Sequence, residues 1–76
     1  MKLEEFIANF ADQFEETEAN FFKADTKFRS LEEWSSLVAL NIIAMVDEEF
    51  DVTIKGEDIR NSETIEDLYK IVINKL

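Results

Sequence analysis

The chain lacks cysteine and histidine altogether. Without cysteine it can form neither a disulfide nor a thiolate nucleophile, and it has no cysteine or histidine ligands for a metal. The missing histidine also removes the commonest general base, on which most catalytic triads depend. These absences argue against an autonomous enzyme, and we predict no catalytic residue and no metal site.

Proline is also absent, and Gly56 is the only glycine. So few turn-forming residues favour helices over strands and tight turns. No apolar stretch approaches the ~20 residues that cross a bilayer, and the N-terminus lacks the apolar core of a signal peptide. We therefore expect no membrane span and a cytoplasmic location.

Charge of one sign dominates, because 18 acidic residues outweigh 8 basic ones and give a formal net charge of −10. Such a chain repels nucleic acid and anionic membranes and attracts basic protein partners. Its 76 residues are enough for a single domain, which we place at 1–76. A hydrophobic content of 46% is that of a folded chain rather than a disordered one.

Apolar spacing predicts a first helix over residues 2–16. Residues 17–34 follow neither a helical nor a strand repeat and form a long loop. Within this loop, Ser30 and Glu33 have the spacing that caps one short helical turn. Trp34 at its end is either a core residue or the border of a partner surface.

Three further elements follow the loop. A helix over 36–50 precedes an extended link and a single helical turn over 56–60. Thr64 then caps the final helix, whose predicted buried stripe is Ile65, Leu68, Tyr69, Val72 and Leu76. The predicted fold is therefore all-α: a small four-helix bundle with three main helices, one short helix and a long first loop.

The helix over 36–50 is apolar on two sides. Steps of 100° per residue give a core face of Ala39, Ile42, Ile43, Val46 and Phe50. The opposite face mixes apolar and acidic side chains, and consists of Leu37, Leu40, Asn41, Ala44, Asp47 and Glu48. A surface that is apolar and acidic together suits docking to a protein partner.

Two serines stand where this helix begins, within the stretch EEWSSLVAL. Serine ahead of an apolar helical run is typical of an N-cap, so Ser35 is the predicted cap and Ser36 the first helical residue. The hydroxyl of Ser36 then lies at the positive end of the helix dipole, where a phosphate is held well. Ser36 is a candidate for a covalent phosphate ester, and a purely structural role for both serines is the alternative.

Residues 28–51 read FRSLEEWSSLVALNIIAMVDEEFD. Ser36 and Leu37 open an apolar and acidic helix, and an EEFD sequence ends it. In these features, in its length and in its acidity, the chain resembles the acyl carrier proteins. That family usually has aspartate where Ser35 stands, so the capping ability is kept and a negative charge is lost. Val38 replaces a commonly acidic position and adds to the apolar character of the docking face.

The resemblance implies that Ser36 carries a 4′-phosphopantetheine arm through a phosphodiester, and that the arm's thiol holds acyl groups as thioesters. It implies a monomeric carrier that catalyses nothing itself and presents acyl intermediates to enzymes of fatty-acid or related polyketide and lipid biosynthesis. The partners would be a phosphopantetheinyl transferase and acyl-transferring or synthase enzymes with basic docking patches. These enzymes would read the face formed by Leu37, Leu40, Asn41, Ala44, Asp47 and Glu48.

The acyl chain would shelter between helices, against Ile42, Val46, Ile59 and Tyr69. Peptidyl, aminoacyl and D-alanyl cargo stay open. So does an unmodified carrier-like module whose helix over 36–50 only binds a protein partner.

Overall fold

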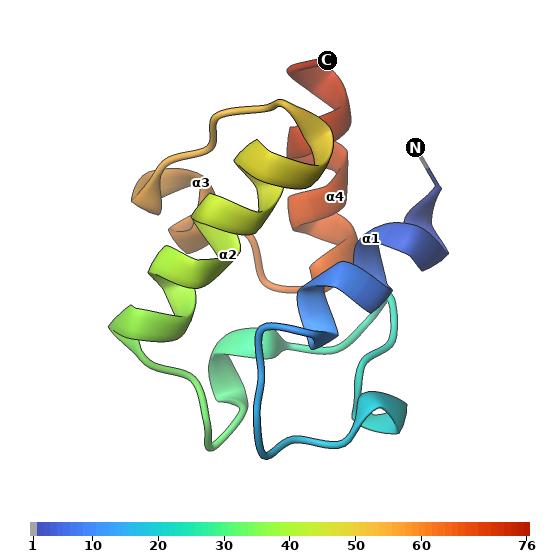
Figure 1. Ribbon diagram of the computed structural model, residues 1–76, viewed down its shortest axis with the longest axis vertical. Helices are drawn as coiled ribbons and strands as arrows, with labels where there is room; N and C mark the ends of the chain where they lie inside the picture. Colours follow the sequence, from blue (N-terminus) through green and yellow to red (C-terminus); the bar gives the residue numbers. More distant parts are fainter. Residues whose placement is uncertain (1) are drawn as a thin grey trace.

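The computed structural model describes residues 2–76 and has four α-helices in that range. They are α1 (Leu3–Ala11), α2 (Ser36–Phe50), α3 (Gly56–Arg60) and α4 (Ile65–Asn74) (Figure 1). Two short 3₁₀ helices, η1 (Ala19–Phe21) and η2 (Phe28–Ser30), lie in the long connection between α1 and α2. The prediction of three main helices, one short helix and a long first loop is confirmed.

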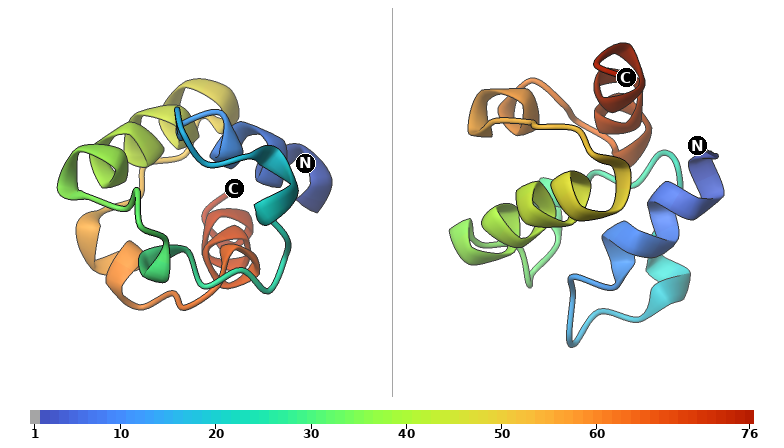
Figure 2. Two further views of the ribbon diagram at one scale, coloured as in Figure 1. Left: turned by 90° about the horizontal axis from the view of Figure 1, so that it is seen from below. Right: turned by 45° about the horizontal axis from the view of Figure 1, so that its top comes forward.

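The four helices close around one interior (Figure 2). Helix α1 packs against α2 and α4, and α3 packs against the same two helices from another side. The molecule measures 30 × 23 × 20 Å. In a molecule of this size the helices can bury their apolar faces only against one another, so every main helix packs one face against its neighbours.

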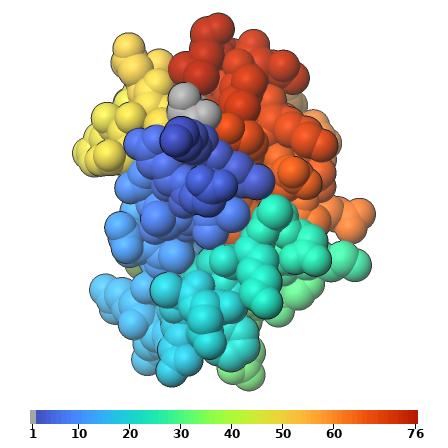
Figure 3. Space-filling model, turned by 90° about the vertical axis from the view of Figure 1, so that its right-hand side faces the viewer, coloured from blue at the N-terminus to red at the C-terminus, as the bar shows by residue number. Residues whose placement is uncertain are grey.

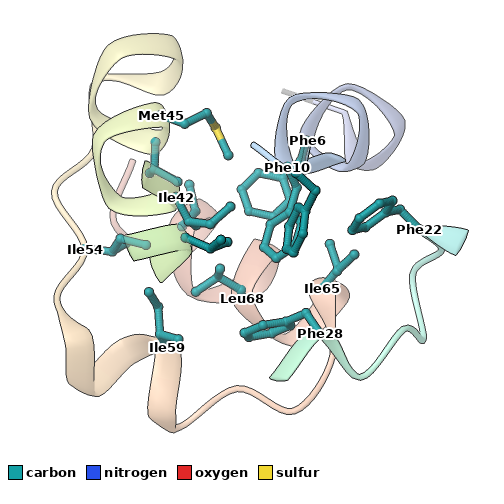
Figure 4. Packing of buried hydrophobic residues seen from close by; sticks show 14 of the residues in the cluster. Phe6, Phe10, Phe22, Phe28, Ile42, Met45, Ile54, Ile59, Ile65 and Leu68 are labelled. Carbon is teal, nitrogen blue, oxygen red and sulfur yellow. The ribbon is translucent and has the colours of Figure 1, made fainter. Parts of the chain in front are cut away.

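Phenylalanine rings and branched aliphatic side chains fill the interior (Figure 4). Phe10 from α1 and Phe28 from η2 are fully buried, and their ring centroids lie 5.3 Å apart in an edge-on contact. Ile42 from α2 and Leu68 from α4 are fully buried beside them. Each such side chain contributes roughly 1.5–3 kcal/mol by leaving water. Phe22 and Phe28 of the long loop are part of this core, whereas Phe21 is 59% exposed.

The long loop is held against α1 and α4, and Figure 3 shows this face. The backbone carbonyls of Thr26 and Ala24 accept hydrogen bonds from the N–H groups of Ile65 and Glu66, at 3.2 and 3.0 Å. The first N–H groups of any α-helix lack partners within the helix. The loop therefore satisfies two of these donors at the start of α4.

Helix α1 ends at Ala11, so the prediction that it continues to residue 16 is wrong. The N–H groups of Gln13 and Phe14 bond in tight turns to the carbonyls of Phe10 and Ala11. Phe14 remains buried, although it is no longer helical. The helical spacing of apolar residues therefore extends beyond the end of α1, because the turn that follows the helix also buries a phenylalanine, Phe14.

Residues 28–33 also differ from the prediction. Ser30 ends η2 and caps no helical turn with Glu33. The carboxylate of Glu33 instead accepts hydrogen bonds from the backbone N–H groups of residues 15–17. The segment that follows α1 is thus bound to the end of the long loop by a contact between residues distant in the sequence.

The buried face of α2 is turned slightly from the predicted one. Val38, Ile42, Met45 and Val46 are its buried residues, and the predicted core residues Ala39, Ile43 and Phe50 are only partly buried. Val38, which the sequence placed on the docking face, is 7% exposed and belongs to the core. The helix ends where Asp51 takes the left-handed conformation with φ 57°, which aspartate tolerates better than most residues.

Helix α4 begins as predicted. Thr64 Oγ1 accepts from the N–H of Asp67, and the Asp67 carboxylate accepts from the N–H of Thr64, each at 3.1 Å. The far end differs, because α4 ends at Asn74 and Leu76 is 68% exposed rather than buried. Within the described residues, no helix is long and apolar enough to cross a membrane.

Candidate functional site

The paired serines at the start of α2 have different surroundings. Ser35 is the N-cap, in an extended conformation, and its Oγ accepts a hydrogen bond from the N–H of Val38 at 3.2 Å. Ser36 is the first residue of α2 and is exposed. No other residue of 2–76 forms a hydrogen bond with the Ser36 hydroxyl. One serine therefore closes the helix end, and the other presents an unused hydroxyl to solvent.

The first turn of α2 contains no acidic residue. Its backbone N–H groups point towards the helix start and give this end a partial positive charge. In a chain with a formal net charge of −10, the start of α2 is thus one of the few places that favour an anion.

A groove of about 380 Å³ opens beside Ser36. It lies between the start of α2, the end of the long loop and α3. Its lining residues are Arg29, Trp34, Ser35, Ser36, Ala39, Gly56, Ile59 and Arg60. The groove combines an apolar wall with hydroxyl and guanidinium groups, which is the usual composition of a site for a small organic group.

Trp34 links this groove to the core. Its ring meets that of Phe28 edge-on, with centroids 5.1 Å apart, and it is only partly buried because another part lines the groove. The structure bears out the core contact predicted for Trp34, and its place at the border of a partner surface stays a prediction.

Both arginines of the chain line the groove. Arg29 Nη2 donates a hydrogen bond to the backbone carbonyl of Ser62 at 3.0 Å, and Arg60 lies at the end of α3. The sequence reasoning did not select either residue. The only available signal was their rarity, since they are the two arginines among 8 basic residues, and nothing local indicated that they meet beside Ser36.

Glu33 is the second polar feature near this end of α2. Its carboxylate accepts from the Thr17 hydroxyl at 2.8 Å and from the N–H groups of Glu15 and Thr17 at 2.7 and 2.9 Å. Partial desolvation would raise the pKa of Glu33, but these hydrogen bonds outweigh it and hold the pKa below its usual value of 4.5. An ionised Glu33 thus fixes the turn after α1 against the segment that leads into α2.

The predicted docking residues share one exposed face of α2. Leu37 and Leu40 are 67% and 62% exposed, which is unusual for leucine. The other four residues predicted for this face, namely Asn41, Ala44, Asp47 and Glu48, are exposed as well. Intervals of three and four residues align them along the helix, so the face is apolar near Ser36 and acidic towards the end of α2.

A family model described as "Phosphopantetheine attachment site" matches residues 4–72, which is nearly the whole chain. No curated protein and no solved structure matches this chain. Members of this family hold 4′-phosphopantetheine covalently on a serine, interact with phosphopantetheinyl transferases and synthase enzymes, and act as carriers rather than catalysts. The helical bundle is consistent with that family. The chain therefore belongs to the phosphopantetheine-attachment family, as a carrier protein of the acyl carrier type.

Proposed function

We propose that Ser36 is the serine that carries 4′-phosphopantetheine, and that the chain delivers acyl intermediates to enzymes of fatty-acid or related polyketide and lipid biosynthesis. The observation that carries this proposal is the division of work between the two serines. The Ser35 Oγ accepts from Val38 N–H, whereas the Ser36 hydroxyl is exposed and makes no hydrogen bond with the described residues. Esterifying Ser36 would leave the cap of α2 intact.

The surroundings of Ser36 suit such a group. The start of α2 favours the negative charge of a phosphodiester, and the apolar residues of the groove can cover aliphatic atoms next to it. When bound, the arm would supply a thiol that holds acyl groups as thioesters, and the chain itself has no cysteine to do so. The protein's own contribution is to bind and orient the arm.

The exposed face of α2 is the proposed docking surface for a phosphopantetheinyl transferase and for acyl-transferring or synthase enzymes. Leu37 and Leu40 would enter apolar hollows on the partner. Asp47 and Glu48 would face its basic patch, which speeds association and sets orientation. The six proposed docking residues are Leu37, Leu40, Asn41, Ala44, Asp47 and Glu48.

An acyl chain on the arm would reach the core by way of the groove. Ile59 is 4% exposed and lines the groove, and Ile42 and Val46 are fully buried. Tyr69 is partly buried at the edge of the same core. We propose that a chain of moderate length displaces side chains near Ile59 and lies against Ile42 and Val46.

Peptidyl, aminoacyl or D-alanyl cargo is the alternative within the carrier class, and an unmodified protein-binding module is the alternative outside it. The acidity of the chain favours acyl cargo, but the partner enzymes select the cargo that is loaded. A monomeric state, a single domain over 1–76 and a cytoplasmic location remain predictions from the sequence.

The test is modification in vitro. The purified protein is incubated with coenzyme A and a broad-specificity phosphopantetheinyl transferase, and the intact mass is measured. We expect the mass gain of one phosphopantetheine in the wild type and in Ser35→Ala, and none in Ser36→Ala. A gain that persists in Ser36→Ala would assign the arm to another residue and contradict the proposal.

A further inference from the structure

Among residues 2–76, neither of the two arginines that line the groove beside Ser36 forms an ion pair with a carboxylate. Among residues 2–76 the only ion pair joins Lys75 and Asp58, 3.8 Å apart. With 18 acidic residues in the chain, arginines without an ion pair are unexpected. Both line the groove that Ser36 borders, so their charge is available to a group bound there.

The two side chains reach the groove from different elements. Arg29 comes from η2, and its Nη2 donates a hydrogen bond to the backbone carbonyl of Ser62, which follows α3, at 3.0 Å. Arg60 comes from the end of α3, and its Nη1 reaches back over the start of that helix, 3.4 Å from where a Cβ on Gly56 would lie.

Guanidinium groups suit phosphate better than ammonium groups do, because their planar set of donors matches two phosphate oxygens at once. A phosphodiester on Ser36 would otherwise add negative charge to a chain that already has a formal net charge of −10. Two positive charges that line the same groove offset this repulsion locally.

We propose that Arg29 and Arg60 together hold the phosphate of the group attached to Ser36, and so dock the arm in the groove between α2 and α3. The proposal rests on the attachment at Ser36 and adds two residues that position the arm. The apolar part of the groove, formed by Trp34, Ala39 and Ile59, would cover the aliphatic atoms next to the phosphate. Raising the salt concentration should loosen the arm, since exposed ion pairs are screened.

The chain offers a direct spectroscopic test, because its two arginines give two side-chain Nε–H signals in a ¹⁵N-labelled sample. The spectrum is recorded before and after loading with coenzyme A and a broad-specificity transferase, with loading verified by intact mass. We expect both arginine signals to shift on loading and to move back as salt is added. If the mass rises and the Ser36 amide shifts while both arginine signals stay in place, the proposal is wrong.

Variants separate the two arginines from charge in general. Arg60→Gln removes a side chain with no hydrogen bond among the described residues, and Lys23→Gln removes the same charge from an exposed site outside the groove. Arg29→Lys keeps a donor for the Ser62 carbonyl. We expect the change in melting temperature on loading to be more favourable in the wild type and in Lys23→Gln than in Arg60→Gln and Arg29→Lys.

Two contrary outcomes are distinct. Equal changes in melting temperature for all four loaded proteins would overturn the arginine contacts and leave the attachment at Ser36 standing. No mass gain in any of them would overturn the attachment itself, and the arginine contacts with it.

Discussion

The two serines at the start of α2 should differ sharply in their effect on stability. In Ser35→Ala, the N–H of Val38 loses the oxygen that now lies 3.2 Å away. Removing an N-cap of this kind costs about 0.5–2 kcal/mol. Val38 is only 7% exposed, so water replaces the lost acceptor poorly and we expect a value in the upper half of that range.

Ser36→Ala should change the free energy of unfolding by less than about 0.5 kcal/mol, as exposed substitutions usually do. The Ser36 side chain is exposed and unbonded within residues 2–76, and alanine favours a helix more than serine does. Ser35→Asp keeps the capping oxygen and adds a negative charge at the helix start, which is worth about 0.3–1 kcal/mol at low salt.

The assay is urea unfolding, followed by circular dichroism and by the fluorescence of Trp34, the only tryptophan. For a domain of this size, 1 kcal/mol corresponds to roughly 4–8 °C in melting temperature. We expect Ser35→Asp to be the most stable and Ser35→Ala the least stable. The wild type and Ser36→Ala should lie between them and be nearly equal. Equal losses in Ser35→Ala and Ser36→Ala would refute the division between a capping and a chemical serine.

Three further predictions concern the core, the loop and the docking face. Phe28→Ala should lower the free energy of unfolding by about 3–5 kcal/mol. Phe21 is 59% exposed, so Phe21→Ala should lower it by under about 0.5 kcal/mol. Equal losses for the two variants in urea unfolding would contradict this prediction. Glu33→Gln should be less stable than the wild type above pH 4.5, the usual pKa of Glu33. This difference in stability should shrink as the pH falls through the lowered pKa of Glu33 in the folded protein. A difference in melting temperature that does not change with pH would exclude the ionised carboxylate as the source of the stability. Glu48→Lys should weaken binding to a loading or synthase enzyme at low salt without lowering the melting temperature. The matched control Glu4→Lys, on α1, should bind that enzyme as the wild type does. Equal binding by both variants would show that Glu48 is not on the docking face.

The sign of the Glu33 effect follows from proton linkage. Its pKa is lower in the folded protein than in the unfolded chain, so the unfolded state binds protons first as the pH falls. The stabilisation is therefore complete above the unfolded pKa and disappears below the folded one. The net charge of −10 acts in the opposite direction, because protonation relieves self-repulsion. For this reason the comparison with Glu33→Gln is needed rather than the wild type alone.

Features set by neighbours in the chain could be predicted from the sequence. Ser35 and Thr64 cap α2 and α4 as expected, because a capping side chain needs only the N–H groups two or three residues ahead. The exposed face of α2 was also predictable, since Leu37 and Leu40 stand among acidic residues at helical intervals.

Features set by distant segments could not be predicted. The segment after α1 is bound to Glu33, whose carboxylate accepts from the N–H groups of residues 15–17, far from it in the sequence. Val38 reads as a surface residue in the sequence, yet it is only 7% exposed in the folded chain. The groove is a still clearer case, because Arg29, Ser36 and Arg60 come from three different elements and meet only in the folded chain.

The most direct test of the central claim is the mass of the protein purified from its own host, with the modified peptide located by fragmentation. The account predicts one phosphopantetheine on Ser36, either free or with an acyl group on its thiol. A native protein that carries no such group, or that carries it on Ser30, Ser35 or Ser62, would contradict the account.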